Sequence, residues 1–272
     1  MAAGADRVDV AQLGRGLARG FGGALIFGLP MLMTNELWHL GTSMDRLRLG
    51  LLLLLSVPLL VGVAHRIGFE ATFGWRDDLR DAGIALGIGL VAAAAILGIF
   101  NLLEPGHSAD AVLGRIAVQA APTGLGAILA RSQFASQRRD EKQEAFAGYP
   151  GALFMMLVGA LFLSLNIAPT EEMIQIAYKM TAWHGLGLLV LTVAVMHGFV
   201  AGRGVEDGKP EPAWSNFLRF TVVGYGLAMI VSLYTLWTFG RTDAVGGEPL
   251  VMTVLVLAFP AGLGAAAARL IL

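Results

Sequence analysis

The sequence predicts an all-α polytopic membrane protein with eight transmembrane helices, built as two parallel four-helix repeats. Of its 272 residues, 56% are hydrophobic and only 14% are charged. This composition leaves too little polar surface to coat a soluble globule of this size. The net charge of -1 argues against a phosphate-binding surface, so we expect no nucleic-acid partner.

Eight apolar runs are long enough to cross a bilayer, because a hydrocarbon core of about 30 Å needs about 20 helical residues. Polar or turn-forming stretches separate these runs. The predicted spans are residues 20–40, 49–66, 81–103, 111–131, 150–169, 182–202, 216–239 and 249–270.

The distribution of basic residues predicts the orientation of these spans. With the spans as assigned, 14 of the 19 Lys and Arg residues fall on one side of the membrane. The positive-inside rule makes that side the cytoplasm. We therefore expect a protein of the inner (cytoplasmic) membrane with both termini in the cytoplasm.

Internal repetition predicts how the spans are grouped. The segments "VQAAPTGLGAILAR" (118–131) and "VLAFPAGLGAAAAR" (256–269) agree at nine of fourteen positions, and Thr34-x-Glu36 recurs as Thr170-x-Glu172. Each copy holds an even number of spans, so both copies enter from the same side, which makes the repeats parallel. The expected divisions are an N-terminal amphipathic segment 1–19, a first repeat 20–133, a cytoplasmic linker 134–149 and a second repeat 150–272.

Acidic residues at repeat-related positions are the first candidates for function. Glu36, Glu171 and Glu172 lie near the outer end of their spans, and Asn166 is a polar residue within the fifth span. Intramembrane carboxylates are costly unless partnered, so these residues fit an ion-binding site or the start of a proton relay. The competing interpretation is a solvated helix end, with Thr170 capping a short surface helix that starts at Glu171.

Two histidines accompany the acids at the outer interface. His39 and His184 each follow a tryptophan, as is common in the aromatic belt, and both are candidates for proton sensing because imidazole titrates near neutral pH. No two histidines have the His-x-x-x-His spacing that places two metal ligands on one helical face, so we expect no metal.

Helix-breaking residues recur in the fourth and eighth spans. Pro122 and Gly124 in one, and Pro260 and Gly262 in the other, are candidates for a local break whose carbonyls face an ion. Close helix packing alone explains such residues more often. Gly83-x-x-x-Gly87 has the same small-residue spacing.

Sequence motifs of catalysis are absent, so we expect neither an enzyme nor a cofactor. An intramembrane enzyme acting on lipid would need a cytoplasmic cluster of acids and histidines. The only residues available for it resemble ordinary loop charges: His65, Glu70, Asp77, Asp78 and Asp81.

Length, hydropathy and the segments "GLPMLMTNELWHLG" and "PTEEMIQIA" together resemble a family of bacterial integral membrane proteins of about this size. The resemblance covers nearly the whole chain. It implies a multi-spanning membrane protein and carries no assigned activity, substrate or site residue.

Together these features favour a transporter or channel for a small ion, a cation or proton, that uses the acids near the outer mouth. The alternative is a structural or accessory membrane protein whose small-residue faces bind partner helices. The expected partners are the lipid bilayer and a small ion or solute, and the glycine-rich faces leave room for a homo-oligomer.

Overall fold

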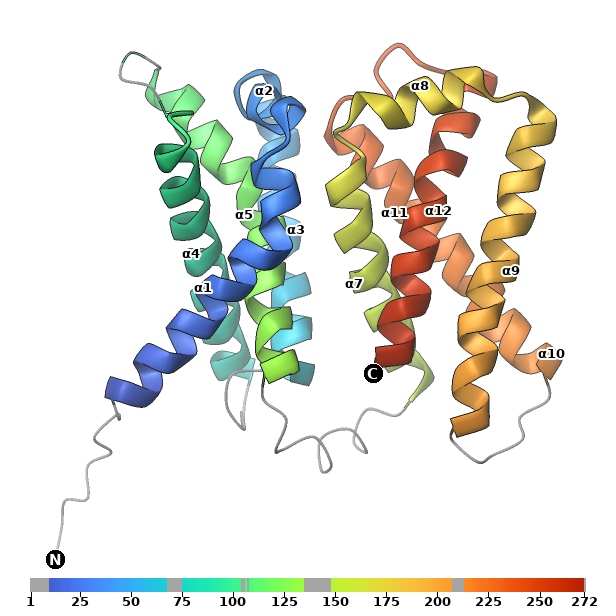
Figure 1. Cartoon of the computed structure of the whole chain (residues 1–272), viewed down its shortest axis with the longest axis horizontal. Helices are drawn as coiled ribbons and strands as arrows, with labels where there is room; N and C mark the ends of the chain where they lie inside the picture. The colour runs from blue at the N-terminus through green and yellow to red at the C-terminus, as the bar shows by residue number, and fades with distance from the viewer. Residues whose placement is uncertain are drawn as a thin grey trace, which may run out of the picture. The chain divides into compact units, whose positions relative to one another are not determined.

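The computed structural model describes residues 10–67, 75–103, 106, 108–134, 148–206 and 213–271, and these residues are helical apart from short connections (Figure 1). The chain divides into two compact units. The first contains residues 1–33 and 53–139, and the second contains residues 34–52 and 140–272. The prediction of an all-helical protein is confirmed for the described residues.

Helix α5 (Ala109–Phe134) is the centre of the first unit, where it packs against α1 (Val10–Leu32) and α4 (Trp75–Ile99). A Cβ atom added to Gly126 would lie 2.9 Å from the carbonyl oxygen of Gly23, so the backbones of α5 and α1 approach closely. This small-residue packing suits a membrane interior, where the hydrophobic effect does not hold helices together.

Helix α12 (Gly247–Ile271) has the corresponding place in the second unit. It packs against four helices of that unit, namely α7 (Tyr149–Ile167), α8 (Glu171–Lys179), α9 (Ala182–Glu206) and α11 (Val223–Thr238). A Cβ atom on Gly159 would lie 2.2 Å from the carbonyl oxygen of Gly264, which makes this the tighter of the two glycine contacts.

Among the described residues, seven helices are long and apolar enough to cross a membrane, and they coincide with seven of the eight expected spans. The seventh expected span combines α10 (Ala213–Asn216), the π-helical turn η1 (Phe217–Val222) and α11. Helix α3 (Arg46–Ile67) provides the second span and contributes residues to both units.

The expected first span, residues 20–40, does not follow the course that the sequence predicted. Helix α1 begins at Val10, so part of the expected segment 1–19 belongs to this helix, and it ends at Leu32. After a short break, α2 (Asn35–Ser43) continues at an angle of 86° to α1. The pair counts as an eighth span only if both helices are taken together. Pro30 weakens the last turn of α1, because proline has no N–H to donate.

Helices α2 and α8 have the same local design. Each is nine residues long and follows a threonine in extended conformation, Thr34 or Thr170. Each is followed by a methionine in extended conformation, Met44 or Met180. The short helix expected to begin at Glu171 is therefore present. Thr170 itself donates its hydroxyl to the carbonyl of Ile167 and does not cap α8 with its side chain.

Candidate functional site

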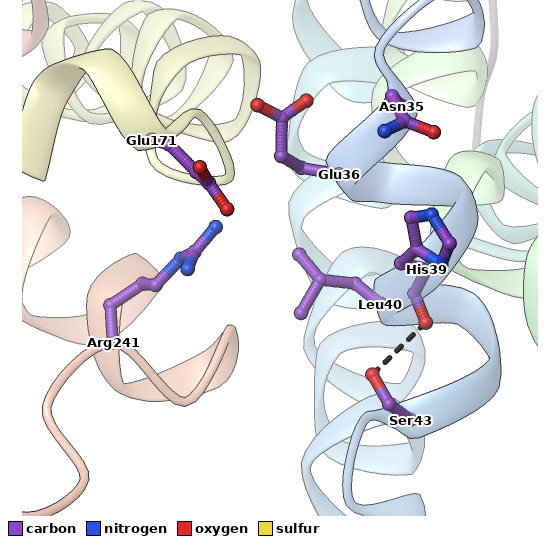
Figure 2. A pocket seen from close by; sticks show the side chains of 7 residues that line it. All are labelled: Asn35, Glu36, His39, Leu40, Ser43, Glu171 and Arg241. Atoms are coloured by element: carbon purple, nitrogen blue, oxygen red, sulfur yellow. Dashed lines mark hydrogen bonds between the residues drawn. The ribbon is translucent and has the colours of Figure 1, made fainter.

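A pocket of about 330 Å³ in the second unit brings together several of the candidate residues (Figure 2). Helix α2 provides most of its wall, Glu171 comes from the first residue of α8, and Arg241 follows α11. The residues that line it are Asn35, Glu36, His39, Leu40, Ser43, Glu171 and Arg241.

The helical period of α2 determines which side chains face this pocket. Residues spaced three or four apart share a helix face, so Glu36, His39 or Leu40, and Ser43 fall on one side. Leu37 and Gly41, also four apart, are buried on another side. Glu36 is thus the second residue of α2 and lies beyond the bend. It does not lie on a straight first span, as its position in the sequence suggested.

Polar contacts fix the corner at which α2 ends. The hydroxyls of Thr42 and Ser43 donate to the carbonyl of His39, at 2.8 and 3.0 Å. Arg46 donates to the carbonyl of Gly41 at 3.0 Å, which satisfies an acceptor at the helix end. These bonds hold His39 and Ser43 at the pocket (Figure 2).

The two adjacent acids of α8 differ in position. Both are exposed, but Glu171 lines the pocket and Glu172 is not among the lining residues. Met173 and Ala177 are buried and anchor the helix. Both acids lie in the first turn, where the helix dipole favours negative charge.

Arg241 is placed by the turn that ends α11. Gly240 has a φ of 72°, in the left-handed region that favours glycine, and the amide of Arg241 donates to the carbonyl of Leu236 at 2.8 Å. The guanidinium donates through Nη2 to the carbonyl of Pro169. Its buried Nε has no hydrogen-bond partner among the described residues. Figure 2 shows the guanidinium and the carboxylate of Glu171 pointing towards each other.

An ion pair beside this turn fixes the connection between α11 and α12. Both terminal nitrogens of Arg48 donate to Asp243, each at 2.8 Å, and the same guanidinium lies 5.1 Å from the ring centroid of Trp237. The hydrogen bond from Arg48 lowers the pKa of the Asp243 carboxyl, and the positive charge acts in the same direction. The connection that carries Arg241 is therefore held by a charge-assisted, bidentate contact.

The chemistry of the pocket is that of a small charged-ligand site. Two carboxylates and one guanidinium line the pocket, which leaves one negative charge in excess when His39 is neutral. The amide of Asn35 and the hydroxyl of Ser43 add uncharged ligands. Such a set can hold a proton or one small cation. No group of three acids or histidines that could hold a metal ion occurs among the described residues.

Other candidate residues lie outside this pocket. The amide of Asn166 donates to the carbonyl of Phe162 in its own helix at 2.7 Å. His184 is exposed, and its Nδ1 lies 2.8 Å from the hydroxyl of Thr181. Both contacts are short-range hydrogen bonds, near the end of α7 and at the start of α9.

The proline and glycine candidates lie inside continuous helices, Pro122 and Gly124 in α5 and Pro260 and Gly262 in α12. A Cβ atom on Gly262 would lie 2.8 Å from the sulfur of Met196 and 3.1 Å from Cγ2 of Thr192, so α12 packs closely against α9 at this glycine. Gly124 is buried against α4. The atoms that surround both glycines therefore indicate that these residues serve close helix packing.

Two of the acids that resembled loop charges are buried in α4, which corrects that interpretation. The exposed fractions are 3% for Asp78 and 8% for Asp81. Oδ2 of Asp78 lies 2.8 Å from Nδ1 of His65, which joins α3 to α4. Asp77 is exposed, and Glu70 lies outside the described residues.

Arg241 is the charged member of the pocket that the sequence did not indicate as a site residue. It contacts the carbonyl of Pro169 across 72 positions in the chain, and no local pattern predicts such a contact. The glycine before Arg241 is a signal for a helix end, but it does not show where the arginine side chain lies.

Comparison with known proteins agrees with the membrane assignment. A family described as "Putative integral membrane protein (DUF2391)" matches residues 16–272. No curated protein and no solved structure matches the chain. The resemblance found in the sequence is confirmed by a match over almost the whole chain, and the chain belongs to the DUF2391 family of integral membrane proteins.

Proposed function

We propose that this integral membrane protein is a transporter or channel for a small ion, a cation or proton, which binds in the pocket of Glu36 and Glu171 near the outer mouth. The observation that carries the proposal is the meeting of these two acids, His39 and Arg241 around one cavity. Titratable groups that converge on a cavity in a membrane protein commonly mark an ion or proton path.

The proposed architecture is a pair of parallel four-helix repeats, and matching local geometry supports it. Asn101 and Gly240, 139 positions apart, both have positive φ. Each lies in a turn whose next amide bonds five residues back, from Leu102 to Leu97 and from Arg241 to Leu236. The equal lengths of α2 and α8 support the same proposal.

The proposed location is the inner (cytoplasmic) membrane with both termini in the cytoplasm, because the basic residues are biased to that side. In this orientation α2 and α8 face the outside. The proposed partners are the lipid bilayer and the ion. The proposal involves no catalytic activity, and the contact between His65 and Asp78 then ties α3 to α4.

The charge of the pocket favours a proton or a monovalent ion over a divalent one. Arg241 offsets one of the two carboxylates, and a divalent cation usually needs several anionic or closely spaced oxygen ligands. His39 adds an imidazole to the lining. The pocket is thus suited to a proton or a small monovalent cation.

The proposal is tested by flux into proteoliposomes that contain pH-sensitive and cation-sensitive dyes. We expect Glu36→Gln and Glu171→Gln each to reduce flux at least tenfold. Glu172→Gln is the matched control, because Glu172 adjoins Glu171 in the same helical turn but does not line the pocket. Equal loss in all three variants, or no wild-type flux above empty liposomes under any imposed gradient, would overturn the proposal.

A structural or accessory role is the second candidate, and one observation favours it. Gly83 and Gly87 lie one turn apart on α4, and a Cβ atom added to either would meet nothing within 4 Å in the described structure. An open small-residue face of this kind binds a second helix in many membrane proteins. If this role is correct, Gly83→Leu and Gly87→Leu disrupt an assembly detected by light scattering in detergent, whether it contains copies of this chain or another protein.

A further inference from the structure

Gln119 is a fully buried amide in the middle of α5, in the first unit. Its side chain has an exposed fraction of 0%. It lies ten residues after the start of α5, about 15 Å along the helix, and thus far from both ends of the predicted span. An uncharged polar side chain at this depth is costly unless each of its polar atoms has a partner.

The orientation of the Gln119 amide is fixed by one contact. Nε2 donates to the carbonyl oxygen of Met31 at 3.2 Å. The opposite assignment would place two acceptors against each other, because a carbonyl cannot donate. The side-chain oxygen Oε1 therefore points elsewhere, and it has no hydrogen-bond partner among the described residues. An amide oxygen cannot rotate to donate, as a buried serine hydroxyl can.

The neighbouring turns contain more acceptors than donors. Pro122 in α5 and Pro30 in α1 have no N–H, so the carbonyls of Val118 and Ile26 lose their helical donors. The carbonyl of Met31, which accepts from Gln119, lies in the last turn of α1, at the negative end of the helix dipole.

The nearest side-chain hydroxyl does not supply a hydrogen-bond donor to Oε1. The hydroxyl of Thr123, one turn after Gln119, donates to the backbone carbonyl of Gln119 at 2.5 Å. Its hydrogen is thus used within α5 and leaves Oε1 without a donor. A group that satisfies an oxygen in such surroundings must carry positive charge or supply hydrogen.

We propose that Gln119 Oε1, together with backbone carbonyls at the C-terminal end of α1, binds a dehydrated alkali cation, sodium or potassium. Neutral oxygens that replace the hydration shell are the usual ligands of monovalent cations inside membranes, and the ends of discontinuous helices supply them. The proposed site is distinct from the pocket of Glu36 and Glu171, which lies in the second unit.

The test measures the thermal unfolding midpoint of the purified full-length protein in detergent. Sodium chloride, potassium chloride and choline chloride are compared at equal ionic strength, because choline is too large for a dehydrated site. We expect one alkali salt to raise the wild-type midpoint by about 3 °C or more over choline chloride, and the more effective salt identifies the cation.

The variants locate the effect. Gln119→Leu removes the oxygen, and we expect it to lose the alkali-specific rise. Ser164→Ala is the matched control, because the Ser164 hydroxyl is also fully buried without a hydrogen-bond partner in the described structure but lies in the second unit. This variant should keep the rise.

If Gln119→Leu does not fold, Gln119→Glu gives a second measurement. A carboxylate at this position should saturate the rise at a salt concentration at least tenfold lower. Equal midpoints in all three salts for the wild-type protein would overturn the proposal and show that a water molecule is sufficient to satisfy Oε1. A rise that persists in Gln119→Leu would also overturn it.

Discussion

Helices α5 and α12 share a sequence framework but differ in what they bury. Both contain Pro-x-Gly-Leu-Gly, and 67% of the membrane-length window of each is buried, the largest share among the candidate spans. Where α5 has Gln119 and Thr123, the aligned positions of α12 are Leu257 and Ala261, and all four side chains have an exposed fraction of 0%.

This difference distinguishes helix packing, which the shared motif provides in both units, from a further role of α5. The shared glycines bring neighbouring helices into close contact in both units. The polar side chains occur at these positions only in α5, so packing alone does not account for Gln119 and Thr123. A residue that differs between otherwise similar helices is therefore the better indicator of function.

The largest effect is expected from closing the glycine contact in the second unit. A Cβ atom on Gly264 would lie 2.3 Å from the backbone oxygen of Gly159, which cannot move without separating α7 from α12. Gly264→Ala should destabilise the protein by about 3 kcal/mol. Gly126→Ala in α5, with its nearest atoms at 2.7 and 2.9 Å, should cost about 1–2 kcal/mol.

Thermal unfolding in detergent measures both variants. Gly187→Ala is the control, because a Cβ atom there would meet nothing within 4 Å. A Gly264→Ala midpoint equal to that of Gly187→Ala would show that the glycine contact does not hold the second unit together.

The next effect comes from transferring the polar residue to the other helix. Leu257→Gln would bury an amide in the apolar interior of the second unit and should destabilise it by about 2 kcal/mol. Leu257→Met, which conserves volume and polarity, should cost less than about 1.5 kcal/mol. Equal unfolding midpoints for the two variants would mean that α12 accepts a buried amide as readily as α5 does.

The smallest effect is expected at the ion pair of the α11–α12 connection. Because Arg48 lowers the pKa of Asp243 in the folded protein, this pair stabilises the fold above the unfolded-state pKa, and the contribution is lost as the pH falls through the lowered value. The wild-type midpoint should exceed that of Asp243→Asn by about 1–2 °C at pH 7. This difference should shrink as the pH falls below about 4. A difference that is independent of pH would assign the effect to something other than this carboxylate.

The helices could be predicted from hydropathy because their length and apolarity are local properties of the chain. The break after α1 could not, since "MLMTNELWHLG" stays apolar enough to continue a span, although Thr34-x-Glu36 matches the threonine and acid that begin α8. Glu171 was predicted together with Glu172, and only the folded helix distinguishes them. Arg241 and Gln119 depend on contacts with Pro169 and Met31, which no sequence pattern contains.

The central claim is that Glu36 and Glu171 act together on one ion. A double-mutant cycle of proteoliposome flux tests this most directly, with Glu36→Gln, Glu171→Gln and the double variant at equal reconstitution. Residues that serve one bound ion are coupled, so the double variant should lose no more flux than the more damaging single variant. Losses that multiply in the double variant would show that the two carboxylates act independently and would contradict a shared site.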